Sequence, residues 1–134
     1  MNFVVHPIGM VRSSLFDRSQ CPHQGNEGAP EAWIEVDPMY VAAIGGLEPG
    51  TEIVILTWMH LADRSVLRVH PKGDERNPIT GVFRTRSADR PNPIGLHRAT
   101  VVAVEPPNRL LVKPLEVVDK TPVVDIKCIL NEMS

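Results

Sequence analysis

Two strings of this sequence place polar side chains among residues that restrict the backbone, as a preformed binding site requires. The first is Arg90-Pro91-Asn92-Pro93-Ile94-Gly95. Its two X-Pro steps hold the chain extended or turned, and Gly95 permits a tight exit. The Asn92 amide would therefore point in a nearly fixed direction, and such a loop binds a ligand at low entropic cost. A rigid strand connection in which Arg90 only pairs with an acid explains the string equally well.

The second string, residues 115–127, interleaves apolar residues with three acids, Glu116, Asp119 and Asp125. Carboxylates where a strand enters or leaves a turn can cap the turn, pair with arginine or bind a cation. Capping or pairing is the simpler role for each of them.

The histidines give a weaker signal. None of them shows metal-ligand spacing, and we expect no metal site. His60 directly follows the apolar run 53–59, and polar residues at strand ends line the mouths of barrels. The chain contains neither GxSxG nor GxGxxG nor a P-loop motif, so a nucleophile-elbow hydrolase and a Rossmann or P-loop nucleotide site are not expected.

Charge is segregated along the chain. The net charge is −2, but the segment from Arg64 to Arg98 holds eight basic and three acidic residues, and the remainder is strongly acidic. A basic segment can mark a phosphate-rich partner, because Lys and Arg release condensed counterions on binding. It can also be a solvated surface that acidic neighbours balance in space.

The elements that must position these residues read as strands. Thirteen prolines scattered through apolar runs favour short strands and turns over long helices. The Asp37-Pro38 step starts one helix of about two turns, which Gly45-Gly46 ends. Seven strands are predicted, over residues 3–12, 33–36, 53–59, 65–69, 81–86, 98–104 and 110–118. We therefore expect an all-β fold in one domain over residues 1–134, a small antiparallel β-barrel of about six to seven strands with one short helix.

The sequence has no apolar stretch near the length of a membrane span and no charged signal region at its start. We expect a cytoplasmic protein without membrane contact.

Several of these strings together resemble the TsaA-like family, also called the YaeB or TrmO family. The resemblance covers nearly the whole chain and rests on residues 8–13, 46–48, 81–87, 90–95 and 119–127. The Arg-Pro-Asn-Pro-Ile-Gly string is long and compositionally improbable, so the match is specific.

The resemblance implies a β-barrel methyltransferase that uses S-adenosylmethionine, usually as a homodimer, and that methylates N6 of threonylcarbamoyladenosine in tRNA. Mapped onto this sequence, the cofactor site falls on His23, Gln24, Gly25, His60, Leu61, Arg86, Leu96, Leu115, Glu116 and Val117. Arg86 would hold the cofactor carboxylate bidentately. We assign Arg90, Asn92, Asp119 and Lys120 to the substrate side. The catalytic base is not selected among Asp119, Asp125 and His60.

Some positions depart from the family pattern. His23 stands where the family usually has arginine, Leu61 stands where it has glutamine, and the sequence ends soon after Leu130, without the C-terminal domain of the tRNA enzyme. Two alternatives therefore stay open: methylation of a small-molecule acceptor, and a non-catalytic barrel that binds RNA or a partner through the Arg64 to Arg98 segment.

Overall fold

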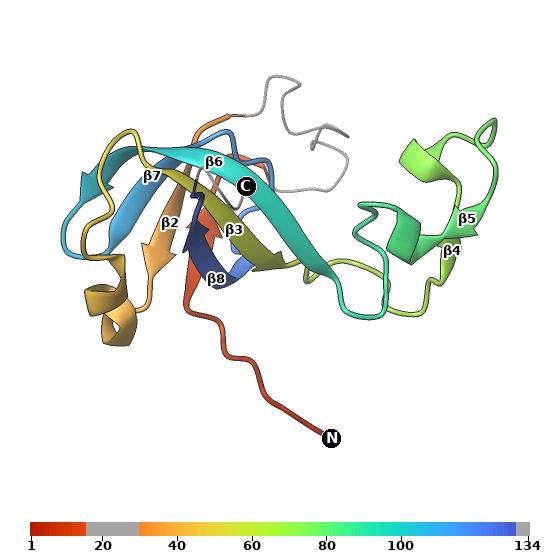
Figure 1. Ribbon diagram of the computed structural model, residues 1–134, viewed down its shortest axis with the longest axis horizontal. Coiled ribbons are helices and arrows are strands. Elements are labelled where there is room, and N and C mark those ends of the chain that lie inside the picture. The colour runs from red at the N-terminus through yellow and green to blue at the C-terminus, as the bar shows by residue number, and fades with distance from the viewer. Residues whose placement is uncertain (16–29, 131–134) are drawn as a thin grey trace.

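The computed structural model describes residues 1–15 and 30–130, and Figure 1 shows their arrangement. The predicted cofactor residues His23, Gln24 and Gly25 lie outside the described residues.

Six antiparallel strands close into a barrel in the order β1-β2-β7-β6-β3-β8. Their bounds are Gly9–Arg12 (β1), Ala32–Val36 (β2), Glu52–Trp58 (β3), Ile94–Glu105 (β6), Arg109–Lys113 (β7) and Pro122–Cys128 (β8). The expected all-β barrel is thus confirmed. Closure pairs every strand with two neighbours and leaves few open edges.

Alternation of side chains fills the barrel. In β3, Ile53, Ile55 and Thr57 are buried and their neighbours face outward, as the two-residue period of a strand requires. The inward positions of the other strands supply the rest of the core, which includes Val11, Ile34, Val36, Ala99, Val101, Leu110, Val112 and Val123. The apolar run 53–59 is therefore one wall of a closed barrel, not a strand covered on both faces.

The predicted helix exists as a 3-10 helix, η2, over Pro38–Ile44. The Asp37 carboxylate accepts a hydrogen bond from the Met39 backbone N–H at 3.1 Å, so Asp37 is the N-cap that the Asp-Pro step indicates. No helix in the described part of the chain has the length and apolar character that crossing a membrane would take.

Several predicted strand bounds were wrong. The 81–86 segment is a two-residue strand, β5 (Thr80–Gly81), followed by a 3-10 turn, η4 (Val82–Arg84). The 65–69 segment is a strand, β4, only over Arg68–Val69, and the 110–118 strand ends at Lys113, because Pro114 has no N–H to continue a ladder. Strand β8 was missed, since the three acids Glu116, Asp119 and Asp125 in and before it suggested a turn.

Residues 59–93 leave the barrel after β3 and return at β6, and we call this excursion the lobe (Figure 1). It carries β4, the turn η3 (Pro71–Gly73), β5 and η4. β4 and β5 form a separate two-stranded sheet. At the base of the lobe the Met59 N–H donates to the Pro93 carbonyl at 2.7 Å, which joins its two ends.

Candidate functional site

One end of the barrel, which we call the rim, gathers the segments that carry most of the predicted site residues. β3 ends there at Trp58, opposite the first residue of β6, Ile94. β7 also ends there, and β8 begins there at Pro122, opposite Met10 of β1. The antiparallel register therefore brings residues 60–61, Leu96, 115–117 and 119–120 to the same end of the barrel, although they are spread over half of the sequence.

Hydrogen bonds tie the ends of the early loop to the segment after β7. The Ser13 hydroxyl donates to the Val117 carbonyl at 2.7 Å, and the Leu115 N–H donates to the Pro30 carbonyl at 3.1 Å. The Asp119 N–H donates to the Leu15 carbonyl at 2.6 Å. Residues 15 and 30, between which the loop with His23 to Gly25 is attached, are thereby held beside residues 115–119.

Within the 115–117 segment only some groups can face a ligand. The side chains of Leu115 and Val117 are completely buried in the barrel core. Glu116, between them, is only partly buried. The cofactor assignment to Leu115 and Val117 can therefore hold only through their backbone groups.

Part of β6 has an open backbone edge next to the rim. The Met59 N–H donates to the Pro93 carbonyl, and the Val101 N–H donates to the Thr51 carbonyl. The odd-numbered residues of β6 between positions 93 and 101 therefore direct their backbone groups toward β3. Leu96 and Arg98 direct their backbone groups away from β3, toward the side on which β7 pairs with β6. That pairing begins only at Thr100. Among the described residues, nothing pairs with Leu96 on this edge. The backbone N–H and C=O of Leu96 can form hydrogen bonds with the edge of a planar base.

A polar contact lies inside the barrel just below the rim. The Thr57 hydroxyl is 2.9 Å from Nε2 of His97 and 3.3 Å from the Met59 sulfur. Burial lowers the pKa of His97 to about 4, because the charged imidazolium would lose its hydration. His97 is therefore neutral near pH 7. Sequence reasoning missed His97, although its spacing from Ala99 and Val101 places it on the inward face of β6.

His60 and Leu61 follow the end of β3 and are both exposed. His60 makes no hydrogen bond or ion pair with another described residue, and the exposed fraction of Leu61 is 50%. The imidazole of His60 is free to meet a ligand at the rim.

The two residues singled out in the Arg-Pro-Asn-Pro string bind the protein's own chain. The Arg90 guanidinium donates to the carbonyl oxygens of Val82 and Thr85, the latter at 3.0 Å. The exposed Asn92 accepts a hydrogen bond from Arg64 at 3.2 Å. The string is thus the rigid connection between lobe and barrel, and Arg90 pairs with carbonyls, not with an acid.

Asp119 likewise has partners within the fold. One carboxylate oxygen accepts the Ser13 N–H at 3.0 Å, and the other lies 3.6 Å from the Arg12 guanidinium. Lys120 is exposed and adopts a left-handed backbone conformation with φ of 69°. Asp119 anchors the turn at the rim, whereas the ammonium group of Lys120 is available to a substrate.

The structure divides the basic segment into two groups. Arg64, Arg76 and Arg90 are engaged with carbonyl, amide or carboxylate groups. The others are exposed and form no ion pair with a described residue: Arg68, Lys72, Arg84, Arg86 and Arg98. Arg86 lies on the lobe and makes no hydrogen bond with the candidates at the rim, so the structure does not join it to them.

Comparison with known sequences identifies relatives along nearly the whole chain. Residues 10–133 match the family model of the tRNA-methyltransferase O N-terminal domain. A probable S-adenosyl-L-methionine-binding protein of Methanothermobacter thermautotrophicus is 42% identical over 127 residues, which cover 95% of this chain and 90% of that protein. An S-adenosyl-L-methionine-binding protein of Archaeoglobus fulgidus is 39% identical over 124 residues, covering 92% of this chain and 87% of that one.

Solved structures agree. The crystal structure of TrmO from Pseudomonas aeruginosa matches with a TM-score of 0.77 and 31% sequence identity, over 98% of this chain and 58% of the TrmO chain. This chain thus spans a little over half the length of that TrmO. With the barrel, its rim and the match over residues 10–133 together, the chain belongs to the family of the tRNA-methyltransferase O N-terminal domain.

Proposed function

We propose that this protein is a methyltransferase that binds S-adenosylmethionine at the rim and methylates N6 of threonylcarbamoyladenosine in tRNA. The observation that carries the proposal is the convergence at one barrel end of His60, the open edge at Leu96, and the 115–117 segment. The names of the relatives, which are S-adenosyl-L-methionine-binding proteins, support the cofactor.

The groups at the rim fit the parts of this cofactor. The open edge at Leu96 offers one N–H and one C=O to the adenine, as backbone groups do in many small-molecule sites. Glu116 and the carbonyl groups around it tolerate the positive sulfonium. Arg86 lies on the lobe and outside the rim, and we assign it to the carboxylate because its planar fork suits bidentate binding. When bound, the cofactor supplies an electrophilic methyl group for an in-line displacement.

For its part, the chain must align the acceptor and take up a proton. Alignment supplies most of the rate enhancement when no covalent nucleophile is needed. An amide-like nitrogen is weakly nucleophilic, so a base at the rim helps. Asp119 is bound to Ser13 and Arg12, and Asp125 lies 3.3 Å from Lys127. His60 forms no hydrogen bond or ion pair with another described residue, and we assign it to accept the proton on an imidazole nitrogen.

The basic side chains that form no ion pair with a described residue support an RNA acceptor. Arg68, Lys72, Arg84 and Arg86 are exposed on the lobe, and each can neutralise a phosphate. An acceptor without phosphates would leave this charge without a counterpart.

The experiment has two stages. Calorimetric titration of the full chain with S-adenosylmethionine is expected to show one site per chain, and absence of binding at millimolar cofactor contradicts the proposal. Labelled cofactor is then incubated separately with bulk tRNA, with tRNA that lacks the threonylcarbamoyl group, and with a small-molecule extract. Label in the first alone supports the proposal. Label in the extract alone identifies a small-molecule acceptor, and salt-dependent RNA binding without label in any pool identifies a non-catalytic barrel.

A further inference from the structure

Lys120 lies at the rim in a backbone conformation that is unfavourable for lysine. Its φ is 69°, in the left-handed region where a Cβ costs energy and glycine does not. Residues other than glycine that persist in this region often lie at functional sites, where the surrounding contacts enforce the conformation. Glycine would fit this position without strain, and what lysine adds there is an ammonium group.

Hydrogen bonds fix the turn that carries Lys120. The Lys120 N–H donates to the Val11 carbonyl at 2.7 Å, which ties the turn to β1. The next residue, Thr121, is 1% exposed, and its hydroxyl donates to the Val118 carbonyl at 2.7 Å. Because the fold already determines the Lys120 backbone, its side chain starts from a defined point at the rim and loses less conformational freedom when it binds a ligand.

The charge of Lys120 is not balanced within the described part of the fold. Asp119, the acid beside it in sequence, accepts the Ser13 N–H at 3.0 Å and lies 3.6 Å from the Arg12 guanidinium. Arg12 also lies 3.0 Å from Glu35, so its own charge is compensated. Lys120 is exposed and forms no ion pair with a described residue. An anionic ligand at this turn would therefore meet a positive charge that is free to bind it.

Lys120 lies on the segment next to the proposed base, His60, because their strands are neighbours. Strand β8 pairs with β3, and Val123 is opposite Thr57. Lys120 precedes Val123 by three residues and His60 follows Thr57 by three, and the strands are antiparallel, so both residues extend beyond the same end of the pair. Paired strands lie about 4.8 Å apart. The fold thus brings an ammonium group and an imidazole to adjoining parts of the rim.

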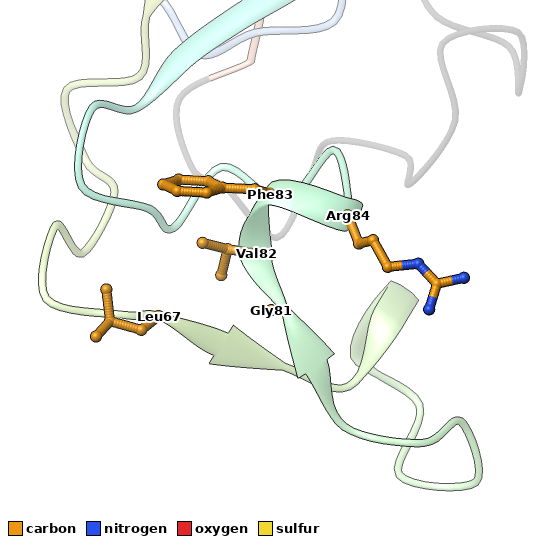
Figure 2. Close-up of a pocket in the computed structure, with 5 residues that line it drawn as sticks. All are labelled: Leu67, Gly81, Val82, Phe83 and Arg84. Atoms are coloured by element: carbon orange, nitrogen blue, oxygen red, sulfur yellow. The ribbon is translucent and has the colours of Figure 1, made fainter.

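Other exposed cations lie on the lobe and suit a different part of an RNA. Figure 2 shows the guanidinium of Arg84 extending away from the phenyl ring of Phe83 on the surface of the lobe. Lys72, in the turn η3, is exposed as well. Such charges can contact phosphates, which position an RNA but are the same in every tRNA. A cation that distinguishes one modified nucleoside has to lie where the base itself is bound, as Lys120 does at the rim.

We propose that the ammonium group of Lys120 binds the carboxylate of the threonylcarbamoyl group, and that this contact lets the protein select tRNA that carries the group. The inference rests on the proposed function. The threonine part of that group ends in a carboxylate and is joined to N6 through the carbamoyl unit, so the anion lies only a few bonds from the acceptor nitrogen. An ammonium-carboxylate pair is a charge-assisted hydrogen bond, which is roughly twice as strong as a neutral one.

The test measures how well the full chain distinguishes two forms of one tRNA transcript, before and after enzymatic addition of the threonylcarbamoyl group. Filter binding without cofactor, at one salt concentration, gives both affinities, and we call their ratio the selectivity. The natural chain is expected to prefer the modified tRNA. Lys120→Gly should lower the selectivity roughly tenfold or more, as loss of a hydrogen bond to a charged group does. Lys120→Arg keeps the charge and should retain most of the selectivity.

Lys72→Gly is the matched control for the backbone. Lys72 is also an exposed lysine in the left-handed region, with φ of 60°, but it lies on the lobe. A phosphate contact of Lys72 serves both tRNAs, so its loss should lower both affinities and leave the selectivity unchanged. Lys113→Ala is the control for charge, since Lys113 is the exposed last residue of β7, which ends at the rim. It too should leave the selectivity unchanged.

Thermal unfolding checks that the variants are folded. Glycine relieves the left-handed strain at position 120, so the melting temperature of Lys120→Gly should not fall below that of the natural chain. Lys120→Asn provides a second uncharged variant, because asparagine also tolerates this conformation, and it should lose selectivity as Lys120→Gly does.

Several results would overturn the inference. They are equal affinity of the natural chain for the two tRNAs, unchanged selectivity in the two uncharged variants, a loss in Lys120→Arg as large as in Lys120→Gly, or an equal loss in Lys113→Ala. Failure of the proposed methyltransferase function is distinct from these, because it appears as absence of label in tRNA, whereas selectivity is measured by binding alone.

Discussion

The Thr57 hydroxyl and Nε2 of His97 lie 2.9 Å apart inside the barrel, at the point where β3 leaves for the lobe and β6 returns. The Thr57 hydroxyl also reaches the Met59 sulfur at 3.3 Å. This contact links the barrel core to the short segment that leads to His60. The contact between Thr57 and His97 requires a neutral imidazole, which has one N–H donor, in a place shielded from water.

The free energy of unfolding should fall in acid because of His97. Its pKa is lowered from 6.5 to about 4 in the folded protein, so the unfolded chain takes up this proton first. The stabilisation is fully present above pH 6.5 and is lost as the pH falls to 4, at a total of about 3 kcal/mol. Denaturant titrations of the natural chain and of His97→Gln at several pH values measure the difference. Equal pH slopes for the two proteins would contradict the prediction.

Gly95→Ala should destabilise the barrel by about 1–3 kcal/mol, because it overpacks this contact. A Cβ at Gly95 would lie 2.5 Å from the Thr57 hydroxyl oxygen and 2.7 Å from Nε2 of His97. Gly81→Ala is the control, since a Cβ there has no atom within 4 Å and its φ of −64° suits alanine. Thermal unfolding compares the two variants, and an equally small change in both would show that Thr57 and His97 can move apart.

Arg90→Lys should loosen the lobe without unfolding the barrel. Lysine keeps the charge but cannot donate from a planar fork to the carbonyls of Val82 and Thr85. Loss of charge-assisted hydrogen bonds of this kind costs about 1.5–3 kcal/mol, so amide exchange over residues 82–90 should speed up roughly tenfold or more. Arg76→Lys is the control, because Asp74 is the one described residue with which Arg76 pairs, and the pair lies on the surface. If amide exchange is unchanged in Arg90→Lys, contacts other than the hydrogen bonds of Arg90 keep the lobe ordered.

Arg86→Ala should weaken S-adenosylmethionine binding by about 1.5–3 kcal/mol, the range for a hydrogen bond to a charged group. Arg84→Ala is the matched variant, since both arginines are exposed on the lobe and neither forms an ion pair with a described residue. Calorimetry measures both affinities. If both variants lose affinity equally, the effect is one of net charge and Arg86 does not hold the carboxylate.

The salt dependence of tRNA binding should report the free basic side chains. Each phosphate contact contributes about 0.7–0.9 to the slope of log affinity against log salt concentration, so Arg68→Ala and Lys72→Ala should each lower its magnitude by about that amount. Arg76→Ala should change it less, because Arg76 is already paired with Asp74 at 2.7 Å. Filter binding over a range of salt concentrations measures the slopes. The same slope in all variants would place the RNA away from the lobe.

The sequence by itself determined the class of fold, the cap at Asp37 and the family resemblance. These depend on local signals: β-branched residues with a two-residue period, an Asp-Pro step and a long rare string. It also indicated where the candidate residues lie, since His60, Leu96 and Glu116 all come next to strand ends.

The tertiary structure alone decided which segments meet and which polar groups are already engaged. Strand β8 contains the charged residues Asp125 and Lys127 among apolar residues, and only its pairing with β3 shows that it is a strand. Arg90 resembles a ligand-binding arginine until the carbonyls of Val82 and Thr85 are seen to occupy it. His97 becomes notable only when β6 turns it toward Thr57. The physical reason is the same in each case, because register and burial arise from contacts between residues far apart in the chain, which local propensity does not record.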